Sequence, residues 1–413
     1  MALRPTVVIV GAGQAGFQTA ASLRERDFDG RIILLGNESG LPYQRPPLSK
    51  GFLTSEDPEE SGLSLRPITF YDRRDIELKY GTAVRIDRDG RCVVLESGEE
   101  LAYDHLVLAL GARNRVLPLS GATLPGVYQL RTLADAIQLR TAIESATDVV
   151  AIGAGFIGME IVSAARKLGK EAAVVDPIDR PMARSLSTHT SRYFARLHAD
   201  HGTTLHLGEQ CTSLRAGRDG SVEGVVLADS TTLDADLVVL GIGVAPNTEL
   251  AAAAGIAVAD GIRTDEYLQT SDPAIFAIGD CACFPMGQSD GLVRLESVQN
   301  AVDQARCVAS TITGDPEPYR TVPWFWSEQF DSKLQVAGLS AGYDTAVPLG
   351  EVNSSSFSVL LFREGVLTCV ESVNRPMDHM SARRILAVGG HLSPEIACQT
   401  GFDLKGHSRG VNA

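Results

Sequence analysis

The feature that most constrains this chain is a glycine turn that occurs twice, each time between a predicted strand and a predicted helix. Residues 6–16 read Thr-Val-Val-Ile-Val-Gly-Ala-Gly-Gln-Ala-Gly, and residues 148–158 read Asp-Val-Val-Ala-Ile-Gly-Ala-Gly-Phe-Ile-Gly. A continuous run of Val and Ile is typical of a buried parallel strand. The glycines allow a tight turn, close approach of the backbone to a pyrophosphate, and close packing of helix on strand. Two such fingerprints predict two bound dinucleotides, and therefore electron transfer between them.

Composition narrows the class of protein. The chain has 413 residues, of which 44% are apolar and 21% charged, as expected for two or three globular domains. A formal net charge of −14 argues against a general binder of nucleic acid or anionic membranes. The first predicted strand begins close to Met1 and no apolar run could span a bilayer, so we expect neither a signal peptide nor a membrane segment. The 7 cysteines are scattered and do not suggest a disulfide framework. We therefore expect a cytoplasmic monomer or weak dimer.

Polar side chains follow the first fingerprint. The next predicted strand, residues 31–35, is followed by Glu38, which is the candidate to accept a hydrogen bond from a ribose hydroxyl, although it could also be a solvated loop carboxylate. Residues 41–50 are too rich in proline for a strand or a helix interior. This stiff run could present Lys50 to a flavin as a fixed cation. Residues 91–95 and 101–111 alternate like the strands of a hairpin and end at a glycine turn.

The second fingerprint is preceded by a linker at residues 112–130 and opens a predicted helix at 156–168. The next predicted strand ends at Asp176, whose carboxylate would accept hydrogen bonds from free ribose hydroxyls and repel a 2′-phosphate, so we prefer NADH to NADPH. Arg180 and Arg184 weaken this preference, because an arginine could hold that phosphate. Arg184 is expected either to contact a hydroxyl or the pyrophosphate of NADH, or to be solvated.

The remaining segments carry fewer motifs. Residues 203–240 suggest further hairpin strands, and the strand at 275–278 stops at a glycine, so that Asp280 could accept a hydrogen bond from a ribityl chain and also cap a helix. An Ala-rich helix is predicted at residues 301–311, and if its N-terminus points at a flavin, its positive end would favour negative charge on the reduced ring. Later strands and one helix predict a small α+β domain that contains both tryptophans. Trp324 is interpreted as a core or interface residue, whereas Trp326 is expected beside the flavin or in the core.

Taken together, these motifs resemble the NADH-dependent ferredoxin reductases of bacterial oxygenase systems, of the putidaredoxin reductase, rubredoxin reductase and biphenyl-dioxygenase reductase type. The resemblance covers nearly the whole chain in order. The Pro-Pro-Leu-Ser-Lys and Pro-Trp-Phe-Trp motifs are specific, whereas the glycine fingerprints are shared across the superfamily. The matching motifs are Gly-Ala-Gly-Gln-Ala-Gly at 11–16, Tyr-Gln-Arg-Pro-Pro-Leu-Ser-Lys at 43–50, Gly-Ala-Gly-Phe-Ile-Gly at 153–158 with Glu160, Phe-Ala-Ile-Gly-Asp at 276–280, Arg-Leu-Glu-Ser-Val-Gln-Asn-Ala at 294–301 and Pro-Trp-Phe-Trp at 323–326.

The resemblance implies an α/β fold with two Rossmann-like, glutathione-reductase-like domains and a small C-terminal α+β domain. The expected FAD-binding domain comprises residues 1–111 and 241–320, the NAD-binding domain 112–240, and the interface domain 321–413. The candidate catalytic residues are Lys50, Glu160 and Trp326, where Lys50 and Glu160 pair near the reactive nitrogen of the flavin and Trp326 stacks by the ring. Asn37 departs from the acid that relatives often carry, which leaves open the contact to the adenosine ribose of FAD.

The candidate cofactor-binding residues form two sets. Those expected to bind FAD are Gly11, Gly13, Gln14, Ala15, Gly16, Glu38, Arg45, Lys50, Ala109, Gly111, Arg113, Asp280, Glu296, Val298 and Trp326. Those expected to bind NADH are Gly153, Gly155, Phe156, Ile157, Gly158, Glu160, Asp176, Arg184, Gly241, Ile242 and Gly243.

Missing cysteines separate this chain from related thiol enzymes. Related disulfide reductases carry Cys-x4-Cys beside the flavin, and other relatives carry one cysteine near Ser39. This chain has no cysteine before Cys92, so the required thiolate nucleophile is absent. Cys281 and Cys283 are interpreted as small buried residues, and we expect no metal site.

The function expected from the resemblance is transfer of a hydride from NADH to FAD, followed by transfer of single electrons to a 2Fe-2S ferredoxin that serves an oxygenase. Because such carriers are usually acidic, we expect a basic docking site formed from Arg66, Arg73, Arg74, Arg306 and Lys333. Two alternatives stay open. One is a cysteine-free NADH-dependent reductase of a small quinone or radical, like monodehydroascorbate reductase. The other is a redox-sensing interaction protein, like the apoptosis-inducing flavoproteins.

Overall fold

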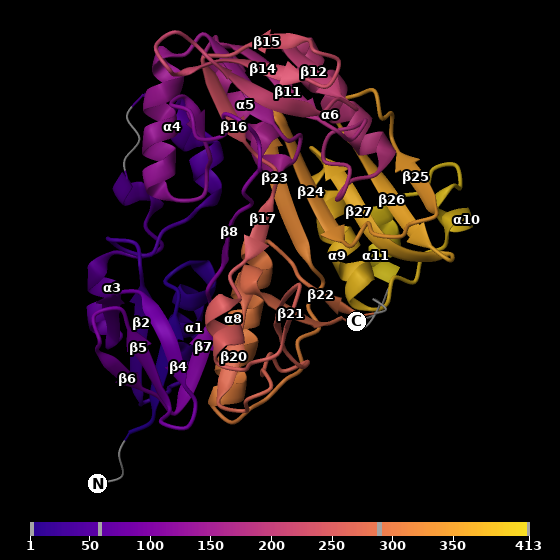
Figure 1. Ribbon diagram of the computed structural model, residues 1–413. Helices are drawn as coiled ribbons and strands as arrows, with labels where there is room; N and C mark the ends of the chain where they lie inside the picture. The colour runs from indigo at the N-terminus through magenta and orange to yellow at the C-terminus, as the bar shows by residue number, and fades with distance from the viewer. Residues whose placement is uncertain (1–3, 57–59, 287–290, 411–413) are drawn as a thin grey trace. The chain divides into compact units, whose positions relative to one another are not determined.

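The chain forms two compact units, each built from three stretches of sequence (Figure 1). The computed structural model describes residues 4–56, 60–286 and 291–410. Unit 1 comprises Met1–Gln44, Glu59–Arg113 and Val244–Thr321, and unit 2 comprises Arg45–Pro58, Asn114–Gly243 and Val322–Ala413. Among the described residues, no helix combines the length and the apolar character needed to cross a membrane.

Unit 1 is organised around a five-stranded parallel sheet in the order β20-β7-β1-β2-β3. Val8 and Ile9 of the first fingerprint are fully buried, because the sheet is covered on both faces. The continuous Val/Ile run therefore forms a buried central strand of a parallel sheet, as its composition predicts. The strands are β1 (Thr6–Val10), β2 (Arg31–Gly36), β3 (Ile76–Tyr80), β7 (His105–Leu108) and β20 (Ile275–Ala277).

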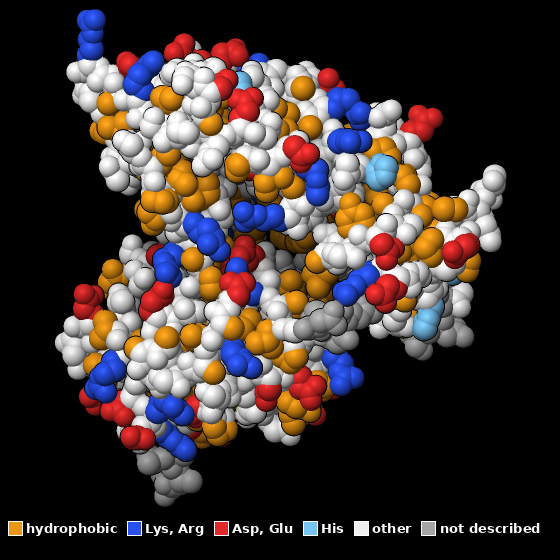
Figure 2. Space-filling view, turned by 45° about the vertical axis from the view of Figure 1, so that its right-hand side comes forward, with side chains coloured by type: hydrophobic (Ala, Val, Ile, Leu, Met, Phe, Trp, Pro, Cys, Tyr) orange, Lys and Arg blue, Asp and Glu red, His pale blue; other side chains and the backbone are white. Residues whose placement is uncertain are grey.

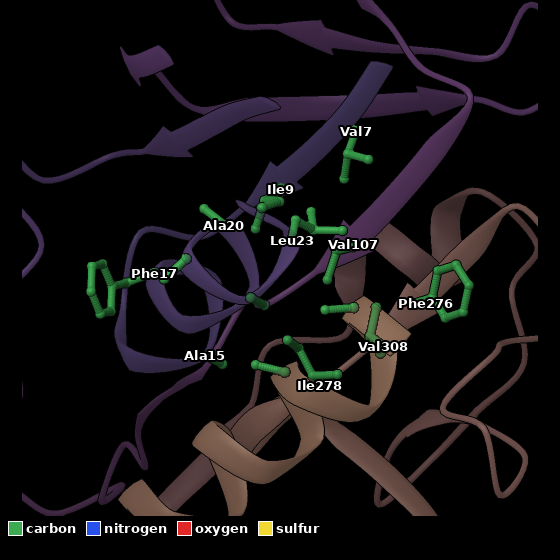
Figure 3. Packing of buried hydrophobic residues seen from close by; sticks show 14 of the residues in the cluster. Val7, Ile9, Ala15, Phe17, Ala20, Leu23, Val107, Phe276, Ile278 and Val308 are labelled. Carbon is green, nitrogen blue, oxygen red and sulfur yellow. The ribbon is translucent and has the colours of Figure 1, made fainter. Parts of the chain in front are cut away.

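Two helices, α1 (Gln14–Glu25) and α8 (Val298–Ile312), contribute to the core on one face of this sheet. Figure 3 shows Phe17, Ala20 and Leu23 of α1 in one cluster with Ile9 of β1 and Val308 of α8. The other face packs against an antiparallel sheet of β4, β5 and β6. These and the smaller elements of unit 1 are α3 (Ile68–Arg73), β4 (Ala83–Asp87), β5 (Cys92–Leu95), β6 (Glu100–Ala102), α7 (Glu249–Ala253), β18 (Val258–Ala259), β19 (Gly261–Arg263), β21 (Ala282–Pro285) and β22 (Leu292–Val293).

Unit 2 repeats this architecture around the second fingerprint, with a parallel sheet in the order β12-β11-β10-β16-β9. An antiparallel sheet of β13, β14 and β15 packs against it, as in unit 1. The elements are β9 (Val127–Tyr128), α4 (Leu133–Ser145), β10 (Asp148–Ile152), α5 (Phe156–Lys167), β11 (Glu171–Asp176), α6 (Thr188–Asp200), β12 (Thr203–Leu207), β13 (Cys211–Ala216), β14 (Val222–Leu227), β15 (Thr232–Asp234) and β16 (Leu237–Leu240).

The end of the chain adds an antiparallel sheet to unit 2, which we call the C-terminal sheet, in the order β23-β24-β27-β26-β25. Phe194 of α6 shares a core cluster with Leu334 and Phe357 of this sheet, so the sheet and the second Rossmann-like domain are packed together. The expected α/β fold class, with two Rossmann-like domains and an α+β addition, is confirmed. The elements are β23 (Trp324–Gln329), β24 (Ser332–Gly338), β25 (Thr345–Leu349), β26 (Phe357–Arg363), β27 (Val366–Val373), α9 (Pro376–Ala387), α10 (Pro394–Ala397) and α11 (Leu404–Gly410).

Two local predictions from the sequence are wrong, and one helix was not predicted. The predicted strand at 101–111 is divided between β6 and β7, because the Asp104 carboxylate accepts a hydrogen bond from Thr6 N at 2.7 Å and the chain there enters the parallel sheet. Residues 203–207 form a parallel partner of β11 and not a hairpin strand. Helix α6 was not predicted, although Ser187 caps it by accepting a hydrogen bond from Thr190 N.

The proline-rich segment was expected in the domain that includes residues 1–111. Residues 41–44 do group with unit 1, but the stretch 45–54 groups with unit 2. It contains a short 3-10 helix, η1 (Pro46–Ser49), and one helical turn, α2 (Gly51–Thr54). Both contact α4 and α5. Arg140 of α4 also donates to the Ser55 carbonyl at 3.0 Å. The buried side chains of Leu48 and Leu53 explain this packing, because they need an apolar surface to cover them.

Two glycines of the first fingerprint should respond differently to alanine. A Cβ on Gly16 would lie 1.9 Å from the Gly11 carbonyl oxygen, whereas a Cβ on Gly13 would meet nothing within 4 Å. We expect Gly16→Ala to lower the free energy of unfolding of the ligand-free protein by about 2 kcal/mol or more, because the backbone must move. Gly13→Ala should cost less than about 1 kcal/mol. Urea denaturation measures both, and equal losses would contradict the packing described above.

Candidate active site

The two glycine turns have the same geometry. Gly11 has φ +113°, and a Cβ there would lie 2.1 Å from the Ala109 carbonyl oxygen. Gly153 has φ +109°, and a Cβ there would lie 2.5 Å from the Gly241 carbonyl oxygen. Each turn is thus pressed against the end of the neighbouring parallel strand, where only glycine fits. As a consequence, both turns lie at the carboxyl edge of their own sheet, where open α/β sheets bind ligands.

The helices that follow these turns begin without a side-chain cap. Gly13 precedes α1 and Gly155 precedes α5, and neither can supply a capping oxygen. Helices α4, α6 and α8, in contrast, are capped by Thr132, Ser187 and Ser297. The first N–H groups of α1 and α5 therefore lack the side-chain acceptor that these other helices have. With the space beside Gly13, this arrangement fits the pyrophosphate of a dinucleotide.

Most residues expected to bind FAD lie at the carboxyl ends of the parallel strands of unit 1. Gly11 to Gly16 follow β1, and Ala109 and Gly111 follow β7. Asp280 lies in the single 3-10 turn η3 (Gly279–Cys281), close after β20. A Cβ on Gly279 would lie 3.2 Å from the Ala15 Cβ, so this turn is next to the start of α1. The fold therefore gathers these residues at one edge of the sheet.

Glu38 and Glu296 are held by neighbouring side chains. Glu38 follows β2, is half-buried and accepts a hydrogen bond from the Tyr43 hydroxyl at 2.6 Å, whereas Asn37 is exposed. Glu296 accepts from Arg294 at 2.5 Å, shortly before Val298 begins α8. The motif around Tyr43 assigns this residue no role, and in the structure its hydroxyl group helps to orient Glu38.

Arg113 has protein partners of its own. Its guanidinium lies 2.6 Å from Glu249 Oε1 and donates to Asn247 Oδ1 at 3.1 Å. It is located in β8 (Ala112–Asn114), which pairs with β17 (Val244–Pro246). Its N–H groups are therefore partly used within the protein.

Lys50 and Glu160 form an ion pair where the proline-rich segment contacts α5. Lys50 Nζ lies 2.8 Å from Glu160 Oε2, and the side chains are 17% and 2% exposed. Lys50 Nζ also donates to the Pro46 carbonyl at 3.2 Å. Glu160 lies just beyond the first turn of α5. The structure brings together these two residues, which are 110 positions apart in the chain.

Two buried serines, to which their sequence motifs assign no role, complete the hydrogen bonding of this carboxylate. Ser49 Oγ donates to Glu160 Oε2 at 2.5 Å, and Ser327 Oγ donates to Oε1 at 2.6 Å. Both serines are buried. Each oxygen of Glu160 therefore accepts from a hydroxyl, and Oε2 also accepts from the ammonium group. A buried charge is tolerated when its hydrogen-bonding capacity is satisfied in this way.

Trp326 and Arg45 also belong to unit 2. Trp326 is half-buried in β23, and its ring centroid lies 5.8 Å from that of Trp324. Trp324 packs against His379 at 5.3 Å and lies under Arg383, which is consistent with its interpretation as a core or interface residue. Arg45 donates to the Arg131 carbonyl at 2.5 Å. Trp326 directly precedes Ser327 in β23, and Ser327 is one of the hydroxyl groups that donate to Glu160.

The residues expected to bind NADH lie at the carboxyl edge of the parallel sheet of unit 2. Phe156 and the exposed Ile157 begin α5, directly after the glycine turn. Asp176 ends β11, and its carboxylate accepts from Ala154 N at 2.7 Å and from Ile178 N at 2.8 Å. These bonds fix Asp176 beside the fingerprint. The candidates at 241–243 follow β16.

The two arginines near Asp176 have different environments. Arg180 donates to the Leu186 carbonyl at 2.8 Å and to the Ala183 carbonyl at 2.9 Å. Arg184 is exposed. Two of the N–H groups of Arg180 already donate to carbonyl groups. Arg180 is therefore less available to bind a 2′-phosphate than the sequence suggested.

Cys281 and Cys283 lie in the core of unit 1, as the sequence predicts. They are 0% and 1% exposed. Burial raises the pKa of the Cys281 thiol to about 12, so this thiol is neutral at physiological pH. Within the described part of the chain, His, Cys, Asp and Glu form no cluster of three that could bind a metal.

The ion pair predicts a thermodynamic cycle. We expect Lys50→Met to lower the free energy of unfolding by about 3 kcal/mol, because the Glu160 carboxylate stays buried without its cation. The double variant Lys50→Met/Glu160→Gln should regain part of this loss. Lys79→Met is the control, since Lys79 forms a more exposed pair with Glu99 and should cost less than about 1 kcal/mol. A double variant no more stable than Lys50→Met, measured by urea denaturation, would show that the ion pair does not determine this stability.

Comparison with known proteins assigns two consecutive stretches of the chain to families of reductases. Residues 5–305 match the family model described as pyridine nucleotide-disulphide oxidoreductase, and residues 324–407 match that described as reductase C-terminal. The chain is 53% identical over 401 residues to rhodocoxin reductase of Rhodococcus erythropolis, covering 97% of this chain and 93% of the relative.

Two solved structures have the same fold over almost the whole chain. A ferredoxin reductase from Rhodopseudomonas palustris superposes with a TM-score of 0.95 and 49% identity, covering 98% of this chain and 100% of that chain. The covalent complex of putidaredoxin reductase with putidaredoxin gives a TM-score of 0.94 and 36% identity, covering 98% of each chain. The resemblance noted from the motifs is thus confirmed, and the chain belongs to the pyridine nucleotide-disulphide oxidoreductase family, with a reductase C-terminal domain.

Proposed function

We propose that this protein is an FAD-dependent reductase that takes a hydride from NADH and passes single electrons to a 2Fe-2S ferredoxin of an oxygenase system. The observation that carries this proposal is the pair of glycine turns, each leading into a helix without a side-chain cap. One turn lies in each unit, so the chain offers two pyrophosphate sites. Relatives at 53% and 49% identity are themselves named as a reductase of rhodocoxin and a ferredoxin reductase.

Unit 1 would hold the FAD. The N–H groups after Gly13 would bind its pyrophosphate, Glu38 its adenosine ribose, and Asp280 its ribityl chain. Tyr43 would keep the Glu38 carboxylate in place through the 2.6 Å hydrogen bond. The N-terminus of α8, beginning at Val298, would favour negative charge on the reduced cofactor.

Unit 2 would bind the NADH. The N–H groups after Gly155 would bind the pyrophosphate, and Asp176 would accept hydrogen bonds from the ribose hydroxyls. A 2′-phosphate would meet the negative charge of Asp176. The choice of NADH over NADPH thus depends on a carboxylate that two backbone amides already hold in place.

The protein's part in the reaction is orientation and electrostatics. When bound, FAD would supply the redox chemistry, accepting two electrons as a hydride and releasing them singly. Lys50 would supply a fixed positive charge that stabilises the negative charge of the reduced cofactor. Glu160 holds the Lys50 ammonium at 2.8 Å, and Ser49 and Ser327 hold Glu160. Trp326 would provide a flat aromatic surface for the flavin ring.

The acceptor is proposed to be an iron–sulfur carrier and not a disulfide. Reduction of a disulfide needs a thiolate nucleophile, and this chain has no cysteine before Cys92. One structural relative, putidaredoxin reductase, has been solved in a covalent complex with putidaredoxin. A cytoplasmic location and a monomeric or weakly dimeric state stay predictions.

Anaerobic stopped-flow mixing tests this function. We expect NADH to bleach the flavin absorbance within milliseconds to seconds, NADPH to do so at least tenfold more slowly, and a 2Fe-2S ferredoxin to re-oxidise the protein rapidly. Fast bleaching without transfer to any ferredoxin would instead support a reductase of small quinones or radicals. Slow bleaching with a persistent long-wavelength band would support a redox sensor.

The docking site for an acidic ferredoxin is proposed at the basic residues predicted from the sequence. On the face drawn in Figure 2, basic side chains are interspersed with acidic ones, so any such dock is local. Arg66 and Arg74 both lie over the Phe70 ring, at 5.8 and 5.9 Å from its centroid, which holds two cations close together. Arg73 and Arg306 are also exposed residues of unit 1, whereas Lys333 belongs to unit 2 and pairs with Glu328.

Charge reversal tests the dock. We expect Arg306→Glu to raise the KM for ferredoxin about tenfold at low salt, and to leave reduction of ferricyanide by NADH unchanged, because only association with the carrier is affected. The control is Arg215→Glu, since Arg215 is a similarly exposed arginine that pairs with Glu223. Rates that do not depend on ionic strength, or an equal effect of the control, would argue against an electrostatic dock.

A further inference from the structure

The loop between β11 and α6, residues 177–187, follows directly from Asp176 and is here called the ribose loop. Its start is fixed by the Asp176 carboxylate, which accepts from Ala154 N and Ile178 N. Its middle is tied to the glycine turn, because Met182 N donates to the Ala154 carbonyl at 2.8 Å. Met182 has φ +53°, a left-handed conformation that a non-glycine residue adopts only where its surroundings impose it.

The C-terminal sheet supplies a buried carboxylate at the end of this loop. Glu371 of β27 is fully buried, and its Oε1 accepts from Ser187 N at 2.6 Å. Its Oε2 accepts from Ser187 Oγ, also at 2.6 Å. Ser187 is the N-cap of α6 and is itself fully buried. One carboxylate from the C-terminal sheet thus fixes both the last residue of the ribose loop and the first turn of α6.

Further contacts from the same sheet hold the rest of the loop. Ser340, in the connection between β24 and β25, donates to the Ser185 carbonyl at 2.8 Å. Gln329 Nε2 of β23 lies 3.4 Å from Met182 Sδ. Met182 and Leu186 share a core cluster with Leu334 and other residues of the sheet. The ribose loop therefore has one side on the second Rossmann-like domain and the other on the C-terminal sheet.

The conformation held in this way determines where the local charges lie. Arg180 is bound to the carbonyls of Ala183 and Leu186, so its guanidinium is turned into its own loop. Release of Leu186 and Ser187 would free Arg180, which could then pair with a phosphate near Asp176. The contacts of the C-terminal sheet therefore keep the Asp176 carboxylate next to the fingerprint and keep the Arg180 guanidinium bound to carbonyl groups of its own loop.

We propose that Glu371, supported by Ser340, is a positioning residue that makes the C-terminal sheet a determinant of dinucleotide choice. By fixing the ribose loop, it keeps Asp176 in place for a ribose with free hydroxyls and keeps Arg180 from a 2′-phosphate. This inference rests on the proposed binding of NADH to unit 2. It extends that function by assigning the selectivity to a residue 195 positions after Asp176 in the sequence.

The test uses variants that keep or remove the acceptors. Glu371→Leu leaves Ser187 N and Oγ without their acceptor, whereas Glu371→Gln keeps the shape and one acceptor oxygen. Burial raises the pKa of Glu371, and glutamine, which has nearly the same size, is the conservative replacement. Asp378→Leu is the matched control, because Asp378 is a buried carboxylate beside the same sheet that binds Ser358 and Arg375 instead of the ribose loop.

The measurement is calorimetric titration of the FAD-loaded protein with ADP-ribose and with its 2′-phosphate, followed by steady-state assays with NADH. Glu371→Leu is expected to weaken binding of ADP-ribose about tenfold and to reduce the preference over the 2′-phosphate at least fivefold. The KM for NADH should rise while kcat changes less than twofold. Glu371→Gln should regain most of the preference, and Asp378→Leu should keep all of it.

A milder variant covers the case in which Glu371→Leu does not fold. Ser340→Ala removes one hydrogen bond to the loop and should reduce the preference for ADP-ribose about two- to threefold. The inference is overturned if Glu371→Leu, or Ser340→Ala in its place, keeps the wild-type preference, or if Asp378→Leu changes it equally. Failure of the wild-type protein to bind ADP-ribose would instead refute the proposed NADH site, so the two ideas fail in different ways.

Discussion

The hydrogen-bonded carboxylate of Glu160 is the interaction on which the candidate site depends. It binds Lys50 and Ser49 from the proline-rich segment and Ser327 from the C-terminal sheet, and its own backbone belongs to α5. Three stretches of chain that are remote in sequence therefore meet at one side chain. A buried carboxylate that lacks one of its partners destabilises the folded protein. The three stretches must therefore all be in place for the Glu160 carboxylate to be tolerated in the interior.

The same principle applies at Glu371, which joins the C-terminal sheet to the start of α6. In both places a buried carboxylate accepts a hydrogen bond from a serine hydroxyl. Both hydrogen bonds join the second Rossmann-like domain to the C-terminal sheet. Apolar packing brings these parts together, as Phe194 and Phe357 show, but packing alone tolerates small shifts. Short, directional hydrogen bonds do not tolerate such shifts, and they therefore fix the geometry that binding and catalysis need.

The sequence predicted the parts of the fold that depend on local pattern. Both fingerprint strands and the helices after them were identified from the Val/Ile runs and the glycine spacing. The pairing of Lys50 with Glu160 was implied only by the family resemblance, which depends on the more specific Pro-Pro-Leu-Ser-Lys motif. The roles of Ser49 and Ser327 were not identified, since a serine beside a lysine or a tryptophan has no pattern of its own and acquires its partner only through tertiary packing. Strand β12 was mistaken for a hairpin strand for a similar reason, because a short alternating run does not reveal which neighbour it joins.

The discontinuous construction of unit 1 has a consequence for how the protein is made. Strand β20 completes the first parallel sheet by pairing with β7, yet these strands are separated by more than 160 residues of chain. During synthesis the first fingerprint therefore emerges long before the edge of its sheet and before helix α8, which covers its core. Until then β7 exposes an unpaired edge, and contacts of such long sequence separation form slowly. The nascent chain thus passes through a stage in which the second Rossmann-like sheet, whose strands lie within residues 127–240, can be complete while the first cannot.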